Sequence, residues 1–130
     1  MERRRRYVIL DSSVWISFLY KEDSQHERAR KVLGGLVNTI LVPEYVLIEV
    51  ATALKRKGKG TDARSFVRQV LEDNETFLPS NTLVHETADL FCTRNDHLSF
   101  TDTALLFLSR EHRVITFDKA LARTISSAHE

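Results

Sequence analysis

The sequence is poor in residues that several common architectures depend on. It has one cysteine, Cys92, which excludes an internal disulfide and favours a reducing compartment; its apolar neighbours predict a small buried side chain. With only four glycines and two prolines, few long loops are expected. No apolar run reaches the roughly 18 residues of a membrane span. The formal net charge is +1, so the overall charge does not indicate a protein that binds polyanions. Any affinity for nucleic acid must come from local basic patches.

The residues that are present suit one domain. A chain of 130 residues with 42% hydrophobic content can bury a real core, and we expect a single domain over residues 1–130. The basic start is not followed by the pattern of a secretion signal, because Asp11 interrupts the apolar stretch after four residues. We therefore expect a soluble protein of the cytoplasm.

Apolar periodicity predicts an alternation of strands and helices. Short apolar runs indicate strands at 7–10, 39–43, 76–80 and 113–117. Apolar stripes and capping residues indicate helices that begin near Ser12 or Ser13 and that cover 24–38, 44–58, 61–73, 81–95, 99–112 and 118–124. Strands separated by helices imply a parallel sheet with helices on both faces. The predicted fold class is α/β, a three-layer α/β/α sandwich around a mainly parallel sheet of four to five strands.

Two aspartates directly follow predicted strands. Asp11 follows the first strand and Asp118 follows the last. If both strands are parallel and central, the two carboxylates share the edge of the sheet at which ligands bind in such folds. The alternative is N-capping, for which aspartate is favoured. This alternative suits Asp118 better than Asp11, because Ser12 and Ser13 already offer capping hydroxyls.

Two further acids occur in apolar helices. Glu49 lies in "YVLIEVATAL", whose composition predicts a helix buried on nearly all sides. An ionised carboxylate there costs on the order of several kcal/mol unless it is paired or binds a metal. Asp102 lies just inside the helix start in "LSFTDTALLFL". The alternatives are a structural salt bridge for Glu49 and, for Asp102, an acid favoured by the helix dipole.

A cation would allow these carboxylates to meet. Converging acids raise one another's pKa and cannot all stay ionised without a positive partner. Mg²⁺ and Mn²⁺ prefer oxygen ligands and activate water for attack on a phosphodiester. Zinc is poorly supported, because the chain has one cysteine and five histidines without ligand-like spacing. The sequence therefore favours Mg²⁺ or Mn²⁺.

Three segments place the acids in a recognisable order: "VILDSSVWISFL", "VPEYVLIEVATAL" and "LSFTDTALLFLSREHRVITFDKAL". Over essentially the full chain, this order resembles the PIN-domain ribonucleases, especially the toxins of VapBC-type toxin–antitoxin systems. The resemblance implies a PIN-like fold with a catalytic, metal-binding set of acids, namely Asp11, Glu49, Asp102 and Asp118. It also implies that hydroxyl groups orient the ligands or water, and these belong to Ser12, Ser13 and Thr116.

The resemblance further implies an activity and partners. It implies divalent-metal-dependent cleavage of RNA, a homodimer and, for a toxin, a small antitoxin protein whose tail blocks the site. Two alternatives stay open: an RNA-processing PIN nuclease without an antitoxin, and a PIN-fold binding module without catalysis. A receiver domain and a haloacid-dehalogenase-type phosphatase are disfavoured, because each needs a second acid close to the first strand, where this chain has Ser12 and Ser13.

Two basic segments are candidate RNA contacts. One precedes the first predicted strand and consists of Arg3, Arg4, Arg5 and Arg6; the other ends a predicted helix and consists of Lys55, Arg56 and Lys57. Near an acidic site, such cations can hold RNA phosphates. The alternatives are a frayed basic terminus for the first segment and stabilisation of the helix dipole for the second.

Overall fold

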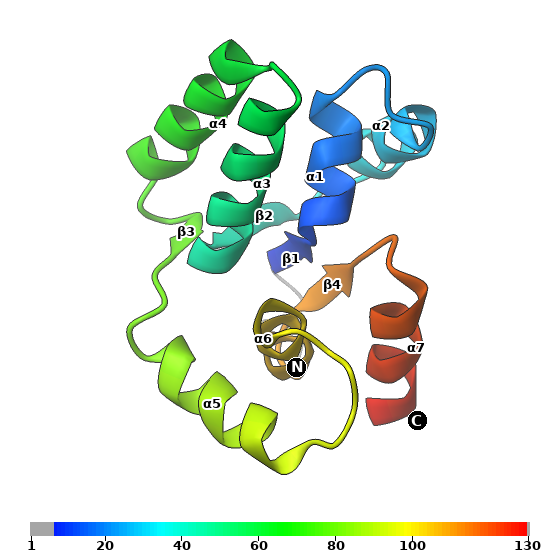
Figure 1. Ribbon diagram of the computed structural model, residues 1–130, viewed down its shortest axis with the longest axis vertical. Coiled ribbons are helices and arrows are strands. Elements are labelled where there is room, and N and C mark those ends of the chain that lie inside the picture. The colour runs from blue at the N-terminus through cyan, green and yellow to red at the C-terminus, as the bar shows by residue number, and fades with distance from the viewer. Residues whose placement is uncertain (1–6, 130) are drawn as a thin grey trace.

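A four-stranded parallel sheet lies at the centre of the molecule (Figure 1). The computed structural model describes residues 7–129, so that Arg3, Arg4, Arg5 and Arg6 lie outside the described residues. The strands are β1 (Tyr7–Leu10), β2 (Thr39–Pro43), β3 (Phe77–Leu78) and β4 (Arg113–Ile115). Their order is β3–β2–β1–β4, with Ile9 of β1 opposite Leu41 of β2 and Val114 of β4.

Helices cover both faces of this sheet (Figure 1). On one side lie α1 (Ser12–Leu19), α2 (His26–Gly34), α3 (Glu44–Arg56) and α4 (Gly60–Glu72). On the other side lie α5 (Leu83–Thr93), α6 (Phe100–Leu108) and α7 (Lys119–Ala128). The predicted three-layer α/β fold is confirmed. Within residues 7–129, no helix combines the length and the apolar character needed to cross a membrane.

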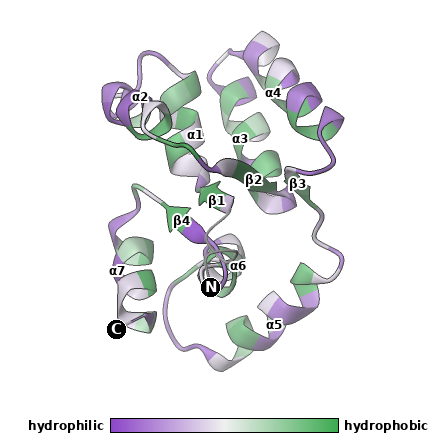
Figure 2. Cartoon of the chain, turned by 180° about the vertical axis from the view of Figure 1, so that it is seen from behind, coloured by the Kyte–Doolittle hydropathy of each residue, from purple (hydrophilic) through white to green (hydrophobic). Residues whose placement is uncertain are grey.

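The core follows from the alternation of side chains along β1. Val8 and Leu10 pack with Val14 of α1 on one face, whereas Ile9 belongs to a second cluster that includes Leu105 of α6. Val8, Ile9 and Leu10 are all fully buried, as expected for an inner strand covered on both faces. Figure 2 shows β1 and β2 as hydrophobic, in contrast to the hydrophilic residues on the outer helices α2 and α4.

Several predicted boundaries were wrong where side chains replace regular hydrogen bonds. β4 ends at Ile115 rather than at residue 117, because the next two residues hydrogen-bond to the segment after β1. It is also an edge strand, not a central one, but it adjoins β1 directly. α6 ends at Leu108, and α7 continues to Ala128.

Cys92 is exposed, contrary to its predicted burial.

Candidate active site

Asp11 lies at the carboxyl end of β1 and is almost fully buried, with 4% of its surface exposed. Its backbone N–H donates to the Ile115 carbonyl at 2.9 Å, which joins the ends of β1 and β4. Its Oδ1 accepts the backbone N–H of Ser12 at 2.7 Å, and the Ser12 Oγ lies 3.4 Å from the same oxygen. Asp11 therefore caps α1, as the capping alternative predicts, and still holds a carboxylate at the edge of the sheet.

Two more hydroxyl groups fix the other oxygen of Asp11. Ser13 Oγ and Thr116 Oγ1 donate to Oδ2 at 3.2 and 2.6 Å. Each hydroxyl also accepts a backbone N–H, from Phe117 to Ser13 at 3.1 Å and from Asp118 to Thr116 at 3.0 Å. This network locks the carboxylate and draws the loop after β4 toward it. The hydroxyls singled out in the sequence thus do contact the first acid.

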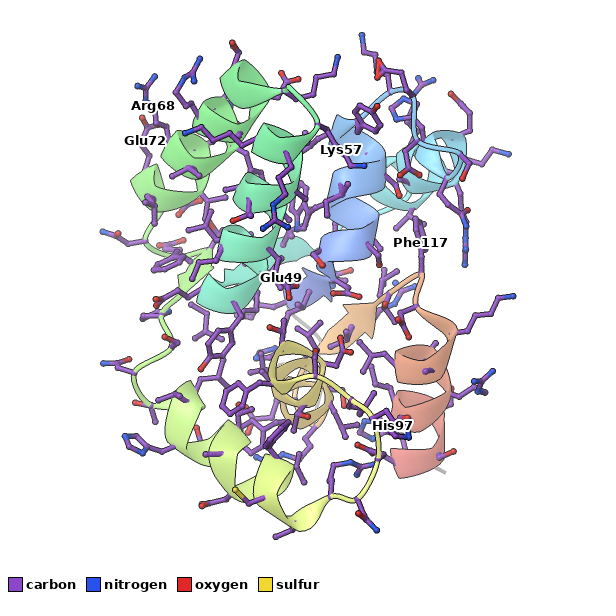
Figure 3. The ribbon with its side chains drawn as sticks, viewed as in Figure 1. Glu49, Lys57, Arg68, Glu72, His97 and Phe117 are labelled. Atoms are coloured by element: carbon purple, nitrogen blue, oxygen red, sulfur yellow. The ribbon has the colours of Figure 1, made fainter. Side chains whose placement is uncertain are left out.

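Glu49 lies on α3, in the middle of the molecule (Figure 3). The prediction that its helix is buried on nearly all sides is wrong, because Ile48 is 54% exposed whereas Val46 and Val50 are fully buried. Only one side of α3 packs against the core, and Glu49 is half-buried at the margin of that side.

The pKa of Glu49 is raised, chiefly because burial penalises its charged form. Hydrogen bonds from the Ser12 and Thr101 hydroxyls lower the pKa, and the negative charges of Asp11 and Asp102 raise it again. Glu49 therefore interacts electrostatically with two acids that come from other elements of the fold. Thr101 was not among the site residues predicted from the sequence, although a hydroxyl beside an acid in the first turn of a helix is a signal that could have found it.

Asp102 lies in the first turn of α6, where its backbone N–H donates to the capping Ser99 Oγ at 3.0 Å. Burial raises the pKa of its carboxyl, and the charges of Asp11 and Asp118 raise it further, whereas hydrogen bonds with Ser99 lower it. Asp102 thus connects the acid after β1 to the acid after β4.

Asp118 is exposed and caps α7. Its Oδ1 accepts the backbone N–H of Leu121 at 2.9 Å, which confirms the capping alternative. Its charge nevertheless acts on Asp102. A capping role and membership of the acidic cluster are therefore compatible at this position.

The four acids form a cluster of like charges. Within residues 7–129, none of them forms an ion pair with a basic side chain, which removes the salt-bridge alternative for Glu49 in that part of the chain. In their present positions, no three histidine, cysteine, aspartate or glutamate side chains of the described chain converge closely enough to hold a metal ion. The donor set of carboxylates and hydroxyls fits a hard divalent cation. One or two of these carboxylates, with waters, would be enough to hold Mg²⁺.

The predicted basic segment at the end of α3 forms no ion pair with these acids. Lys55, Arg56 and Lys57 are all exposed. The Nζ of Lys57 lies 4.8 Å from the ring centroid of Tyr20, so that this side chain turns toward the end of α1. The structure does not bring any of the three into contact with Asp11 or Glu49.

The fold and the acids at one sheet edge define an α/β protein with an unpaired acidic cluster. Residues 8–125 match the PIN domain family, and the chain belongs to that family. The predicted resemblance is thereby confirmed. The fold is similar to the crystal structure of Mycobacterium tuberculosis VapC20, a sarcin-ricin loop cleaving toxin, with a TM-score of 0.75 and 17% sequence identity over 89% of this chain and 93% of that one. No curated protein sequence matches this chain.

Proposed function

We propose that this protein is a divalent-metal-dependent endoribonuclease and the toxin of a VapBC-type pair. Membership of the PIN family and the VapC-type fold support a nuclease toxin. The observation that carries the proposal is the electrostatic coupling of the acids: Asp102 responds to both Asp11 and Asp118, and Glu49 responds to Asp11 and Asp102. Such a cluster without a basic partner in the described chain is suited to a cation.

The proposed division of labour follows from the contacts of each acid. Asp11 is the rigid ligand, because Ser13 and Thr116 hold its carboxylate. Glu49 from α3, Asp102 from α6 and Asp118 after β4 complete the set. A bound Mg²⁺ or Mn²⁺ would supply an activated water and stabilise the charge that develops on the phosphate. Because the pKa values of Glu49 and Asp102 are raised, protons compete with the cation for these two carboxylates.

A homodimer is also proposed, through an apolar patch beside Glu49. Ile48 and Phe91 are 54% and 42% exposed. The Phe91 ring lies 5.4 Å from Phe100, which in turn lies 5.7 Å from Tyr45, so that the patch joins α3, α5 and α6. Exposed apolar side chains that lie together are typical of protein–protein contacts. Sedimentation velocity of Ile48→Lys is expected to show a monomer where the wild type shows a dimer.

Cleavage assays test the activity directly. Varied RNAs are incubated with the protein in EDTA, Mg²⁺ or Mn²⁺, beside Asp11→Asn, Glu49→Gln and the control Glu72→Gln, which changes an exposed acid of α4. Cleavage is expected only with a divalent ion, and only in the wild type and the control. Equal cleavage by the wild type and both site variants, or none by the wild type with any RNA and either ion, would contradict the proposal.

The antitoxin is tested separately. A small reading frame beside the gene, whose product binds the protein and suppresses cleavage, is expected for a toxin in the cytoplasm. Cleavage without such a partner would instead identify an RNA-processing PIN nuclease, and binding of RNA without cleavage would identify a non-catalytic module.

A further inference from the structure

A groove between α3 and α4 combines a small apolar floor with three cationic side chains. It encloses about 220 Å³ and is lined by Ala51, Lys55, Ala63, Arg64, Val67 and Arg68. The floor is made of two alanines and a valine, which leaves room for the aliphatic stems of the three long side chains. The groove lining contains no acid.

The three cations are available to a ligand. Lys55, Arg64 and Arg68 are exposed, and none forms an ion pair with another residue of the part of the chain described. Arg64 donates a hydrogen bond of 3.3 Å to Thr61, which leaves most of its donors free. Glu72 lies one turn after Arg68 on the outer side of α4, yet no ion pair joins them (Figure 3).

The two aspartates Asp62 and Asp73 lie on a different side of α4 from Arg64 and Arg68. Asp62 and Asp73 line a separate hollow on the other side of the helix, together with residues of α1 and β2. Arg64 and Arg68 line the groove between α3 and α4, and Glu72 lies beside Arg68 on the outer side of α4 (Figure 3). Three cations thus line one groove whose lining contains no acid, which is typical of a binding face for a polyanion.

The groove is connected to the acidic cluster through α3. This helix carries both Glu49 and Lys55, and a rise of 1.5 Å per residue places them roughly 9 Å apart along its axis. That separation corresponds to about three nucleotides of a stacked strand, at roughly 3.4 Å per phosphate. Thr52, which lies between Glu49 and Lys55 on α3, is exposed, so that the surface of the helix between the cluster and the groove is open at this position.

We propose that this groove binds the phosphates of the RNA strand that flanks the bond to be cleaved. The proposal rests on the proposed ribonuclease function for its choice of polyanion. It assigns Lys55, Arg64 and Arg68 as phosphate contacts and leaves out Lys57, which turns to Tyr20. An acidic helix of a protein partner is a less suitable occupant. The volume of the groove is below the roughly 300 Å³ at which ligand pockets begin, and its floor offers no deep site for large apolar side chains of such a helix.

Binding in EDTA tests the groove without cleavage. The variant Lys55→Gln/Arg64→Gln/Arg68→Gln is compared with Lys31→Gln/Arg110→Gln/Arg113→Gln, a control with the same change of charge at exposed positions of other elements. Fluorescence anisotropy follows a labelled single-stranded oligoribonucleotide over a series of KCl concentrations. Relative to the wild type, we expect the groove variant to bind on the order of tenfold more weakly, with the salt slope reduced by about 2, at 0.7 per lost cation. The control is expected to lose less than a third of that slope.

Equal affinities and slopes for the groove variant and the control would overturn the proposal. It would also be overturned if polyglutamate displaced the RNA from the groove and bound the wild type more tightly than RNA does, since the occupant would then be an acidic peptide. If the wild type cleaves no RNA, the ribonuclease function is contradicted. The binding comparison in EDTA still tests the groove, because it does not depend on cleavage.

Where cleavage occurs, substrate length gives a second measurement. A long single-stranded RNA reaches the groove from the acidic cluster, whereas a trinucleotide does not. The groove variant is expected to raise KM for the long RNA and to cleave the trinucleotide as the wild type does. An equal loss on both substrates would show a general defect and contradict the assignment.

Discussion

Thr116 donates a hydrogen bond of 2.6 Å from its Oγ1 to Oδ2 of Asp11, a residue 105 positions earlier in the chain. The same hydroxyl accepts the backbone N–H of Asp118 at 3.0 Å. One side chain therefore links the acid after β1 to the loop that carries the acid after β4. Together with the sheet and the hydrogen bond from the Phe117 N–H to Ser13 Oγ, this relationship fixes the spacing of the two carboxylates.

Replacing Thr116 by valine keeps the shape of the side chain and removes this link. Because a hydrogen bond to a buried carboxylate is lost, we expect the free energy of unfolding to fall by about 1–3 kcal/mol in urea denaturation. Thr124→Val is the matched control, since that hydroxyl contacts only the Ala120 carbonyl in its own exposed helix. Cleavage is expected to fall on the order of tenfold in Thr116→Val and to stay unchanged in Thr124→Val. A stability loss without any change in cleavage would leave Thr116 with a structural role only.

The two roles of Asp118 can be separated by two substitutions. Asparagine keeps an oxygen that can accept the Leu121 N–H, whereas alanine does not. We expect Asp118→Ala to lower the free energy of unfolding by about 1 kcal/mol and Asp118→Asn to leave it nearly unchanged. Both are expected to lose cleavage activity, because neither retains the negative charge. Full activity of Asp118→Asn would show that Asp118 is a cap and not a member of the site.

The raised pKa values of Glu49 and Asp102 predict a pH dependence for the metal-free protein. The folded state holds these protons more readily than the unfolded chain does, so that their contribution to stability is most favourable at acid pH. It declines as the pH rises from the ordinary carboxyl range through the raised folded-state values. In EDTA, Glu49→Gln is therefore expected to have a higher Tm than the wild type at neutral pH, with the difference shrinking toward pH ~4. Mn²⁺ is expected to reverse the order, because it stabilises only the protein that binds it.

Thermal scans at several pH values, with and without Mn²⁺, provide this measurement. Glu72→Gln, which changes an exposed acid on α4, is the control and is expected to follow the wild type throughout. A Tm difference for Glu49→Gln that does not change with pH would show that the glutamate is not destabilised by its charge.

The sequence predicted what depends on local pattern. The apolar run of β1 and the acid that ends it were both recognised in this way, whereas the hydroxyl of Thr116 was singled out only through the family resemblance. The burial of α3 was misjudged, because tertiary neighbours decide which side of a helix is covered, and they leave Ile48 54% exposed. The strand at 113–117 was predicted too long for a similar reason: a contact with Ser13, far away in the sequence, ends the ladder before Phe117.

The cationic groove shows the same limit. Lys55 stood out in the sequence within a basic run, but its partners Arg64 and Arg68 belong to the next helix. Only the packing of α4 against α3 brings the three together. Lys57, two residues after Lys55, is not part of this groove and contacts the ring of Tyr20 instead.

The central claim is that the acids at this sheet edge bind a divalent cation, and a titration with Mn²⁺ followed by electron paramagnetic resonance tests it most directly. The signal of free Mn²⁺ is expected to disappear saturably with the wild type, and the affinity to fall at least about tenfold in Glu49→Gln and in Asp102→Asn. Asp96→Asn is the control, because Asp96 is paired with Arg94 in the α5–α6 connection. Saturable binding that only the two cluster variants lose is the predicted result. No saturable binding by the wild type, or the same affinity in all four proteins, would contradict the account.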